Sequence, residues 1–171
     1  MKHNLKRRDF LKAGAGVSAL SFTLLRSEQV FGAQANSKIE IGLIGSGGRG
    51  GWITNLFQEH GGYKVVACAD YFQERVDEVG EKYGVEPARR YTGLSCYKKL
   101  LDGKLDAVAI ESPPYFHPEQ AATAVDSGRH VYLAKPIAVD VPGCESVEAS
   151  AALQRGNRPL KPHMVSIFTD S

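Results

Sequence analysis

The chain has 171 residues, 43% of them apolar, which is enough for one domain with a substantial core. Its net charge of +2 is unevenly distributed, since residues 1–36 carry six Lys and Arg against two Asp and Glu, whereas residues 37–171 carry 15 against 17. The folded part is therefore not expected to bind nucleic acid. Three widely spaced cysteines, with no histidine spacing to complete a zinc site, argue against a disulfide framework and a bound metal.

Residues 1–36 are predicted to be an export signal. The stretch at 6–12, Lys-Arg-Arg-Asp-Phe-Leu-Lys, resembles the twin-arginine motif, and the alternative is a chance arginine pair before an amphipathic helix. The apolar stretch at 13–25 is shorter than the roughly 20 residues that span a bilayer. We therefore expect the twin-arginine translocase as a partner, cleavage near Ala35, and a periplasmic or otherwise exported protein that carries a cofactor loaded before export.

The first predicted strand leads into a glycine-rich loop. Apolar residues alternate over 38–44, and a helical pattern follows the loop Gly45, Ser46, Gly47, Gly48, Arg49 and Gly50. In a Gly-x-Gly-x-x-Gly loop the first glycine allows the tight turn, the second lets the backbone approach a pyrophosphate, and the third permits close packing of helix on strand. The start of the helix also attracts phosphate. Arg49 is predicted either to contact a phosphate or to lie on the surface.

The second predicted strand, at residues 63–69, ends in Asp70, which follows Gly50 by 20 residues. A carboxylate at this position accepts hydrogen bonds from an adenosine ribose. The alternative is that Asp70 caps the helix expected over 72–83. Because Asp70 would repel a 2′-phosphate, and residues 71–73 include no arginine, NAD is the predicted cofactor and NADP the alternative.

The remaining chain continues the alternation of strands and helices. Strands are predicted at 90–91, 105–110 and 129–134, and helices at 95–101, 119–127 and from 140 or 142 to about 155. This order predicts an α/β fold over residues 37–157, a doubly wound parallel sheet of Rossmann type. Ligands bind beyond the carboxyl ends of such strands. The glycine loop, Asp70, Ser112–His117 and Lys135 all lie at those ends.

Over residues 38–155 the chain resembles the glucose–fructose oxidoreductase/inositol dehydrogenase (Gfo/Idh/MocA) family. The resemblance rests on the glycine loop, on Ala69-Asp70, on Ser112-Pro113 with His117, and on Ala134-Lys135-Pro136, where the family usually has Glu-Lys-Pro. It implies a nicotinamide-dependent oxidoreductase that acts on a sugar or polyol, with Lys135 as the catalytic residue beside cofactor and substrate. A solvated lysine is the alternative for Lys135. Ser112 and Pro113 would flank the dinucleotide, and His117 would either lie near it or cap a helix.

The resemblance also implies a second α/β domain, because members of the family are about twice as long. A truncation or a reading-frame change near Asn157 is expected, and the proline-broken tail 158–171 is expected to be disordered. The surface left uncovered predicts low stability and association into homo-oligomers. Two other functions stay open: a glycosidase of the same family that uses NAD transiently, and a dinucleotide-binding fragment without turnover.

Overall fold

The computed structural model of the protein describes residues 38–157, with side chains up to 154. The predicted export signal and cleavage site, and the tail 158–171, lie outside the described residues. Among the described helices none is both long and apolar enough to cross a membrane.

The described residues alternate between strands and helices, as the sequence predicts. The strands are β1 (Ile39–Ile44), β2 (Tyr63–Asp70), β3 (Arg90–Thr92), β4 (Ala107–Ile110) and β5 (His130–Leu133). The helices are α3 (Gly48–His60), α4 (Gln73–Lys82), α5 (Cys96–Asp102), α6 (His117–Asp126) and α7 (Val141–Asn157). Two short 3-10 helices, η2 (Pro87–Arg89) and η3 (Pro114–Phe116), are additions to the predicted elements.

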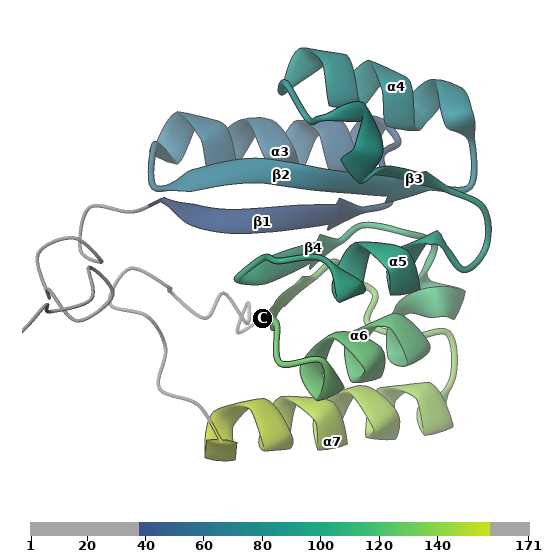
Figure 1. Ribbon diagram of the computed structural model, residues 1–171. Helices are drawn as coiled ribbons and strands as arrows, with labels where there is room; N and C mark the ends of the chain where they lie inside the picture. Colours follow the sequence, from purple (N-terminus) through teal and green to yellow (C-terminus); the bar gives the residue numbers. More distant parts are fainter. Residues whose placement is uncertain (1–37, 158–171) are drawn as a thin grey trace, which may run out of the picture. The chain divides into compact units, whose positions relative to one another are not determined.

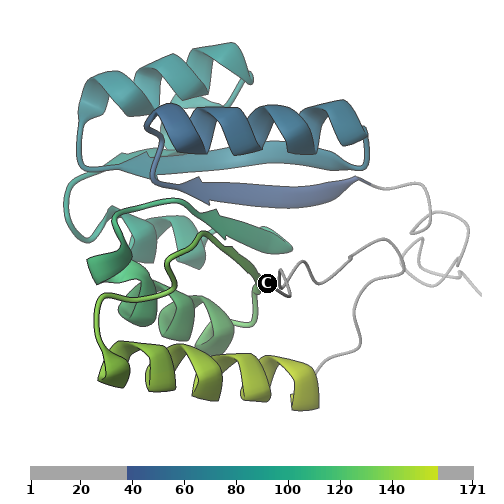
Figure 2. The same ribbon diagram turned by 180° about the vertical axis from the view of Figure 1, so that it is seen from behind.

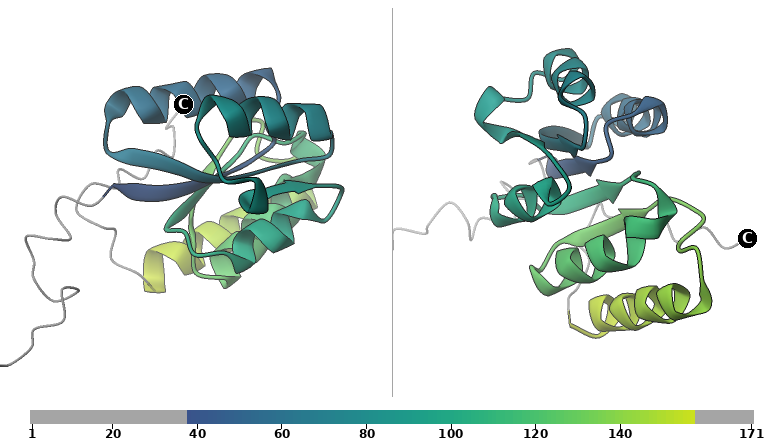
Figure 3. Two further views of the ribbon diagram at one scale, coloured as in Figure 1. Left: turned by 45° about the horizontal axis from the view of Figure 1, so that its top comes forward. Right: turned by 90° about the vertical axis from the view of Figure 1, so that its right-hand side faces the viewer.

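The five strands form one parallel sheet in the order β3-β2-β1-β4-β5, which confirms the predicted doubly wound α/β fold. Helices α3 and α4 cover one face of the sheet and α5 and α6 the other (Figure 1; seen from behind in Figure 2). Helix α7 packs beside α6, on the side away from α3 and α4 (Figure 3). The strand order reverses at β1, so the carboxyl ends of β1, β2 and β4 border the crevice where such sheets bind ligands.

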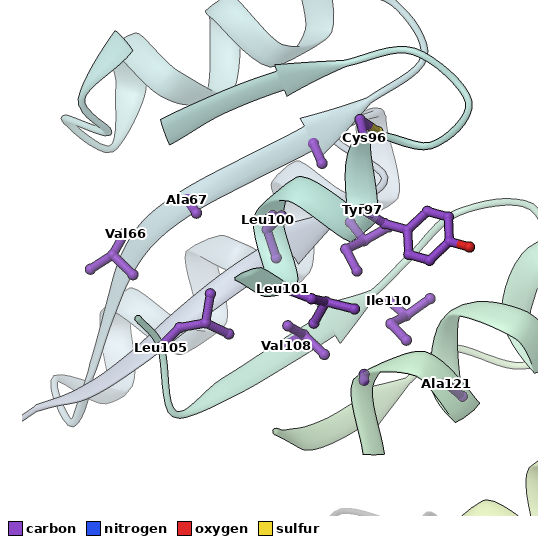
Figure 4. Packing of buried hydrophobic residues seen from close by; sticks show 13 residues of the cluster. Val66, Ala67, Cys96, Tyr97, Leu100, Leu101, Leu105, Val108, Ile110 and Ala121 are labelled. Atoms are coloured by element: carbon purple, nitrogen blue, oxygen red, sulfur yellow. The ribbon is translucent and has the colours of Figure 1, made fainter. Parts of the chain in front are cut away.

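Burial on both faces explains why the central strands are almost entirely apolar. In β4, Val108 and Ile110 face α5 and α6, whereas Ala107 and Ala109 face α3 and α4. Figure 4 shows the first of these clusters, in which Leu100 and Leu101 of α5 pack with apolar residues of β1, β2 and β4. These two packed layers fix the strand ends, and with them the loops that form the site.

Candidate functional site

A cavity of about 560 Å³ opens at the carboxyl ends of β1, β2 and β4. Eight of the residues that the sequence predicts for the site line it: Gly45, Gly47, Gly48, Arg49, Gly50, Asp70, Ser112 and Pro113. The remaining three, Ser46, His117 and Lys135, do not line this cavity. Residues up to 76 positions apart in the sequence thus line one cavity, which is the size of a small-molecule site.

Two glycines of the loop are required by the packing of the protein itself. Gly45 has φ +93°, and a Cβ there would lie 2.4 Å from the Ser112 backbone nitrogen. A Cβ on Gly50 would lie 1.9 Å from the Gly45 carbonyl oxygen. Both distances are far below van der Waals contact with backbone atoms, so larger residues do not fit without displacing the loop.

Gly47 differs, because the protein leaves space beside it. A Cβ on Gly47 would meet only the Arg75 side chain, with Nη1 at 3.3 Å. Gly47 also has ordinary extended backbone angles, φ −71° and ψ −172°, so its conformation does not demand glycine. What glycine provides at this position is an open backbone at the cavity wall, where a ligand can approach closely.

The start of α3 supplies hydrogen-bond donors to the same cavity. Gly47 is the N-cap residue without a side-chain cap, and the first turn of α3 carries no acidic residue. The first N–H groups of the helix therefore have no intrahelical acceptor, and the first turn of α3 itself carries no carboxylate to neutralise the positive end of the helix dipole. This arrangement fits a phosphate group.

Asp70 connects the end of β2 to the glycine loop. Its Oδ2 accepts a hydrogen bond from the Ser46 backbone N–H at 2.7 Å, and its Oδ1 accepts one from the Phe72 N–H at 3.0 Å. The N-cap residue of α4 is Phe72 rather than Asp70. Because each carboxylate oxygen has two lone pairs, Asp70 can also accept a hydrogen bond from a ribose hydroxyl in the cavity.

His117 is buried and joins two loops at the carboxyl edge of the sheet. Its Nε2 lies 2.7 Å from the Ser112 carbonyl oxygen and its Nδ1 lies 3.0 Å from that of Pro136. Burial lowers the pKa of His117, while the backbone carbonyls beside the ring act in the opposite direction. His117 is the first residue of α6, whose N-cap is Phe116. The structure therefore places His117 behind Ser112, where it holds the loop and does not line the cavity.

Lys135 is exposed at the carboxyl end of β5, and its peptide bond to Pro136 is cis. The Ala134 N–H donates to the Ile110 carbonyl oxygen at 3.0 Å, which extends the pairing of β4 with β5 by one step. Ala134, where the resemblance expects glutamate, therefore lies opposite Glu111. The neighbouring strand thus carries a carboxylate at the position in register with 134.

Sequence reasoning missed two charged residues that line the cavity, Arg75 and Glu111. The Arg75 guanidinium lies 4.8 Å from the centroid of the Phe72 ring. The Glu111 side chain is fully buried, and its Oε2 accepts a hydrogen bond from Arg49 Nε at 2.9 Å. Its Oε1 has no hydrogen-bond partner among the described residues. Burial raises the pKa of Glu111, and the contact with Arg49 opposes that rise.

Residues 39–158 match the family model described as the oxidoreductase family with an NAD-binding Rossmann fold (GFO_IDH_MocA). The chain belongs to this family. It is 27% identical to an α-N-acetylgalactosaminidase from Shewanella oneidensis over 180 residues, which cover 91% of this chain and 39% of the relative.

Solved structures agree with the family assignment. A scyllo-inositol dehydrogenase from Lactobacillus casei is 27% identical with a TM-score of 0.61, covering 70% of this chain and 34% of its own. A 3-ketoreductase from Actinomadura kijaniata, solved with NADP and TDP-benzene, is 27% identical with a TM-score of 0.59, covering 69% and 35%. The chain thus spans less than two fifths of the length of these proteins, and the part that it matches is the NAD-binding Rossmann domain.

Proposed function

We propose that the cavity binds a nicotinamide dinucleotide, with its diphosphate over the start of α3. The observation that carries this proposal is the open backbone at Gly47, next to two glycines that packing requires. Asp70 would accept a hydrogen bond from the adenosine ribose on the β2 side. Ser112 and Pro113, which follow β4, would flank the other half of the dinucleotide.

For the choice of dinucleotide we propose NAD, because the Asp70 carboxylate would repel a 2′-phosphate. Arg75 supports NADP as a second ligand, since its guanidinium lines the same cavity five residues after Asp70. Mass spectrometry of the dinucleotide that co-purifies with the chain, followed by calorimetric titration with NAD and with NADP, tests both statements. Tighter binding of NADP would refute the preference, and no binding of either would refute the proposed site.

We further propose that the bound dinucleotide would accept a hydride from a carbinol carbon of a sugar or polyol, while the hydroxyl proton would pass to solvent. Lys135 would lie near the reacting oxygen, where its ammonium can hydrogen-bond a hydroxyl and stabilise the charge that develops on it. The similarity to an inositol dehydrogenase supports this reaction. In a full-length version of the protein, replacing Lys135 with alanine should abolish turnover and leave dinucleotide binding unchanged. Equal turnover by the variant would exclude this role.

The second candidate is a glycosidase that oxidises and re-reduces its substrate on the same cofactor, and the similarity to an α-N-acetylgalactosaminidase favours it. Product analysis after incubation with myo-inositol and with an aryl α-N-acetylgalactosaminide separates the alternatives. Reduced cofactor formed with inositol indicates a dehydrogenase, whereas release of the aryl group without net cofactor reduction indicates a glycosidase. Dinucleotide binding without either product indicates a binding domain without turnover.

A further inference from the structure

Arg49 and Glu111 form an unusual pair at the wall of the cavity. The Glu111 side chain has 0% exposure and holds Arg49 through Nε alone, whereas the Arg49 side chain is 53% exposed. Neither Nη group of Arg49 has a hydrogen-bond partner among the described residues. The buried carboxylate thus holds Nε of the Arg49 guanidinium, and the N–H groups of both Nη atoms stay available beside the start of α3.

This arrangement is not what the fold needs for stability. Burying a carboxylate costs free energy that one hydrogen bond to a half-exposed arginine does not recover, and Glu111 Oε1 is buried without any partner among the described residues. A hydrophobic residue would fill the position at lower cost. Buried charges of this kind, at the edge of a cavity, are typical of groups that serve a ligand.

We propose that Glu111 is a positioning residue for the cofactor: it orients Arg49 so that the two Nη groups point at the diphosphate of the dinucleotide. This inference rests on the proposed function. Arg49 is the second residue of α3, so its guanidinium and the free N–H groups of the helix would bind the same anion. A carboxylate next to an anion site would ordinarily weaken binding, and here it strengthens binding through Arg49.

The sign of the Glu111→Ala effect decides the proposal. Simple electrostatics predicts tighter binding of NAD when a nearby negative charge is removed. If Glu111 orients Arg49, the dissociation constant for NAD should instead rise about tenfold in Glu111→Ala, as in Arg49→Ala, because a charged hydrogen bond to the diphosphate is lost. The double variant should bind no more weakly than either single variant, since both changes remove one interaction.

The test is calorimetric titration of NAD into the 171-residue chain and these variants, with circular dichroism and thermal unfolding to show that each is folded. Glu111→Gln should retain most of the affinity, because its side-chain oxygen still accepts from Arg49 Nε. Glu74→Ala removes an exposed carboxylate that does not line the cavity and serves as the control. Adenosine, which lacks phosphate, should bind the parent and Glu111→Ala equally.

Unchanged or tighter NAD binding by Glu111→Ala would overturn the proposal, and so would additive effects in the double variant. Equal loss in Glu111→Gln and Glu111→Ala would also overturn it, because it would show that the charge and not the orientation matters. If the parent chain binds NAD and only the variants behave otherwise than expected, the proposed function stands and this inference fails. If the parent binds no dinucleotide, both fail.

Discussion

Gly50→Ala and Gly51→Ala add the same methyl group at adjacent positions of α3, and the structure predicts opposite results. A Cβ on Gly50 would lie 1.9 Å from the Gly45 carbonyl oxygen, whereas a Cβ on Gly51 would meet no heavy atom within 4 Å. The two variants therefore separate a steric requirement of the loop from the general effect of glycine in a helix.

The cost at Gly50 can be worked out from what would have to move. The obstructing atom belongs to the backbone of Gly45, whose N–H donates to the Ala69 carbonyl oxygen at 2.8 Å. Overpacking in a core costs about 1–3 kcal/mol, and we expect the upper end because a rigid backbone must shift. For a domain of this size, that loss lowers the melting temperature by about 10 °C. Gly51→Ala should instead stabilise the protein by up to about 1 kcal/mol, the helix preference for alanine.

Thermal unfolding followed by circular dichroism measures both effects, and calorimetric titration with NAD reports on the loop. Gly50→Ala should lose stability and affinity together, because the displaced Gly45 carbonyl belongs to the cavity wall. Gly51→Ala should bind NAD like the parent, since Gly51 does not line the 560 Å³ cavity. Equal melting temperatures for the two variants would show that the turn at Gly45 tolerates a side chain, and the steric account would be wrong.

Three further predictions concern the cavity and the predicted export signal. Gly47→Ala should change the free energy of unfolding by less than about 1 kcal/mol. It should weaken NAD binding more than tenfold, because its methyl group would enter the space proposed for the diphosphate. Affinity equal to that of the parent in calorimetric titration would contradict this. The raised pKa of Glu111 means that ionisation of its carboxyl group destabilises the fold; this cost is absent below the ordinary carboxyl pKa of 4.5 and present above the raised value. The melting temperature of Glu111→Gln should therefore exceed that of the parent at pH 7 but not at pH 4. An equal difference at both pH values would refute the assignment. Replacing Arg7 and Arg8 by lysine should retain the uncleaved chain in the cytoplasm, as measured by cell fractionation and intact-mass spectrometry. Export of the double variant would exclude the twin-arginine route.

The sequence alone predicts the five strands and the helices between them, because each follows from a local pattern of apolar and polar residues. The apolar run of β1, the glycine loop and the carboxylate of Asp70 follow one another within about 30 residues. The sequence does not predict the 3-10 helices η2 and η3, because three residues are too few to show a helical period of apolar residues. Each begins with proline, which is the only local indication of their position.

The charged residues of the cavity are harder to predict from the sequence, because only the tertiary structure brings them together. Arg75 lies beyond the three residues that follow Asp70, and the first turn of α4 places it beside the end of β2. Glu111 follows the last apolar residue of β4, and its importance comes from Arg49, 62 positions earlier in the chain. The sequence predicts His117 as a site residue, but only the packed structure reveals that its ring joins the Ser112 and Pro136 loops.

The two hydrogen bonds of Asp70 set a limit on redesigning cofactor preference. Because an acidic residue at the end of the second strand favours NAD in this fold, replacing it is an obvious way to favour NADP. Here the Asp70 carboxylate also accepts a hydrogen bond from the Ser46 N–H, so its removal would release the glycine loop along with the proposed ribose contact. A change of preference toward NADP that preserves the loop should therefore leave Asp70 and Arg75 in place and alter Tyr71, which lines the cavity without supporting the loop through a hydrogen bond among the described residues.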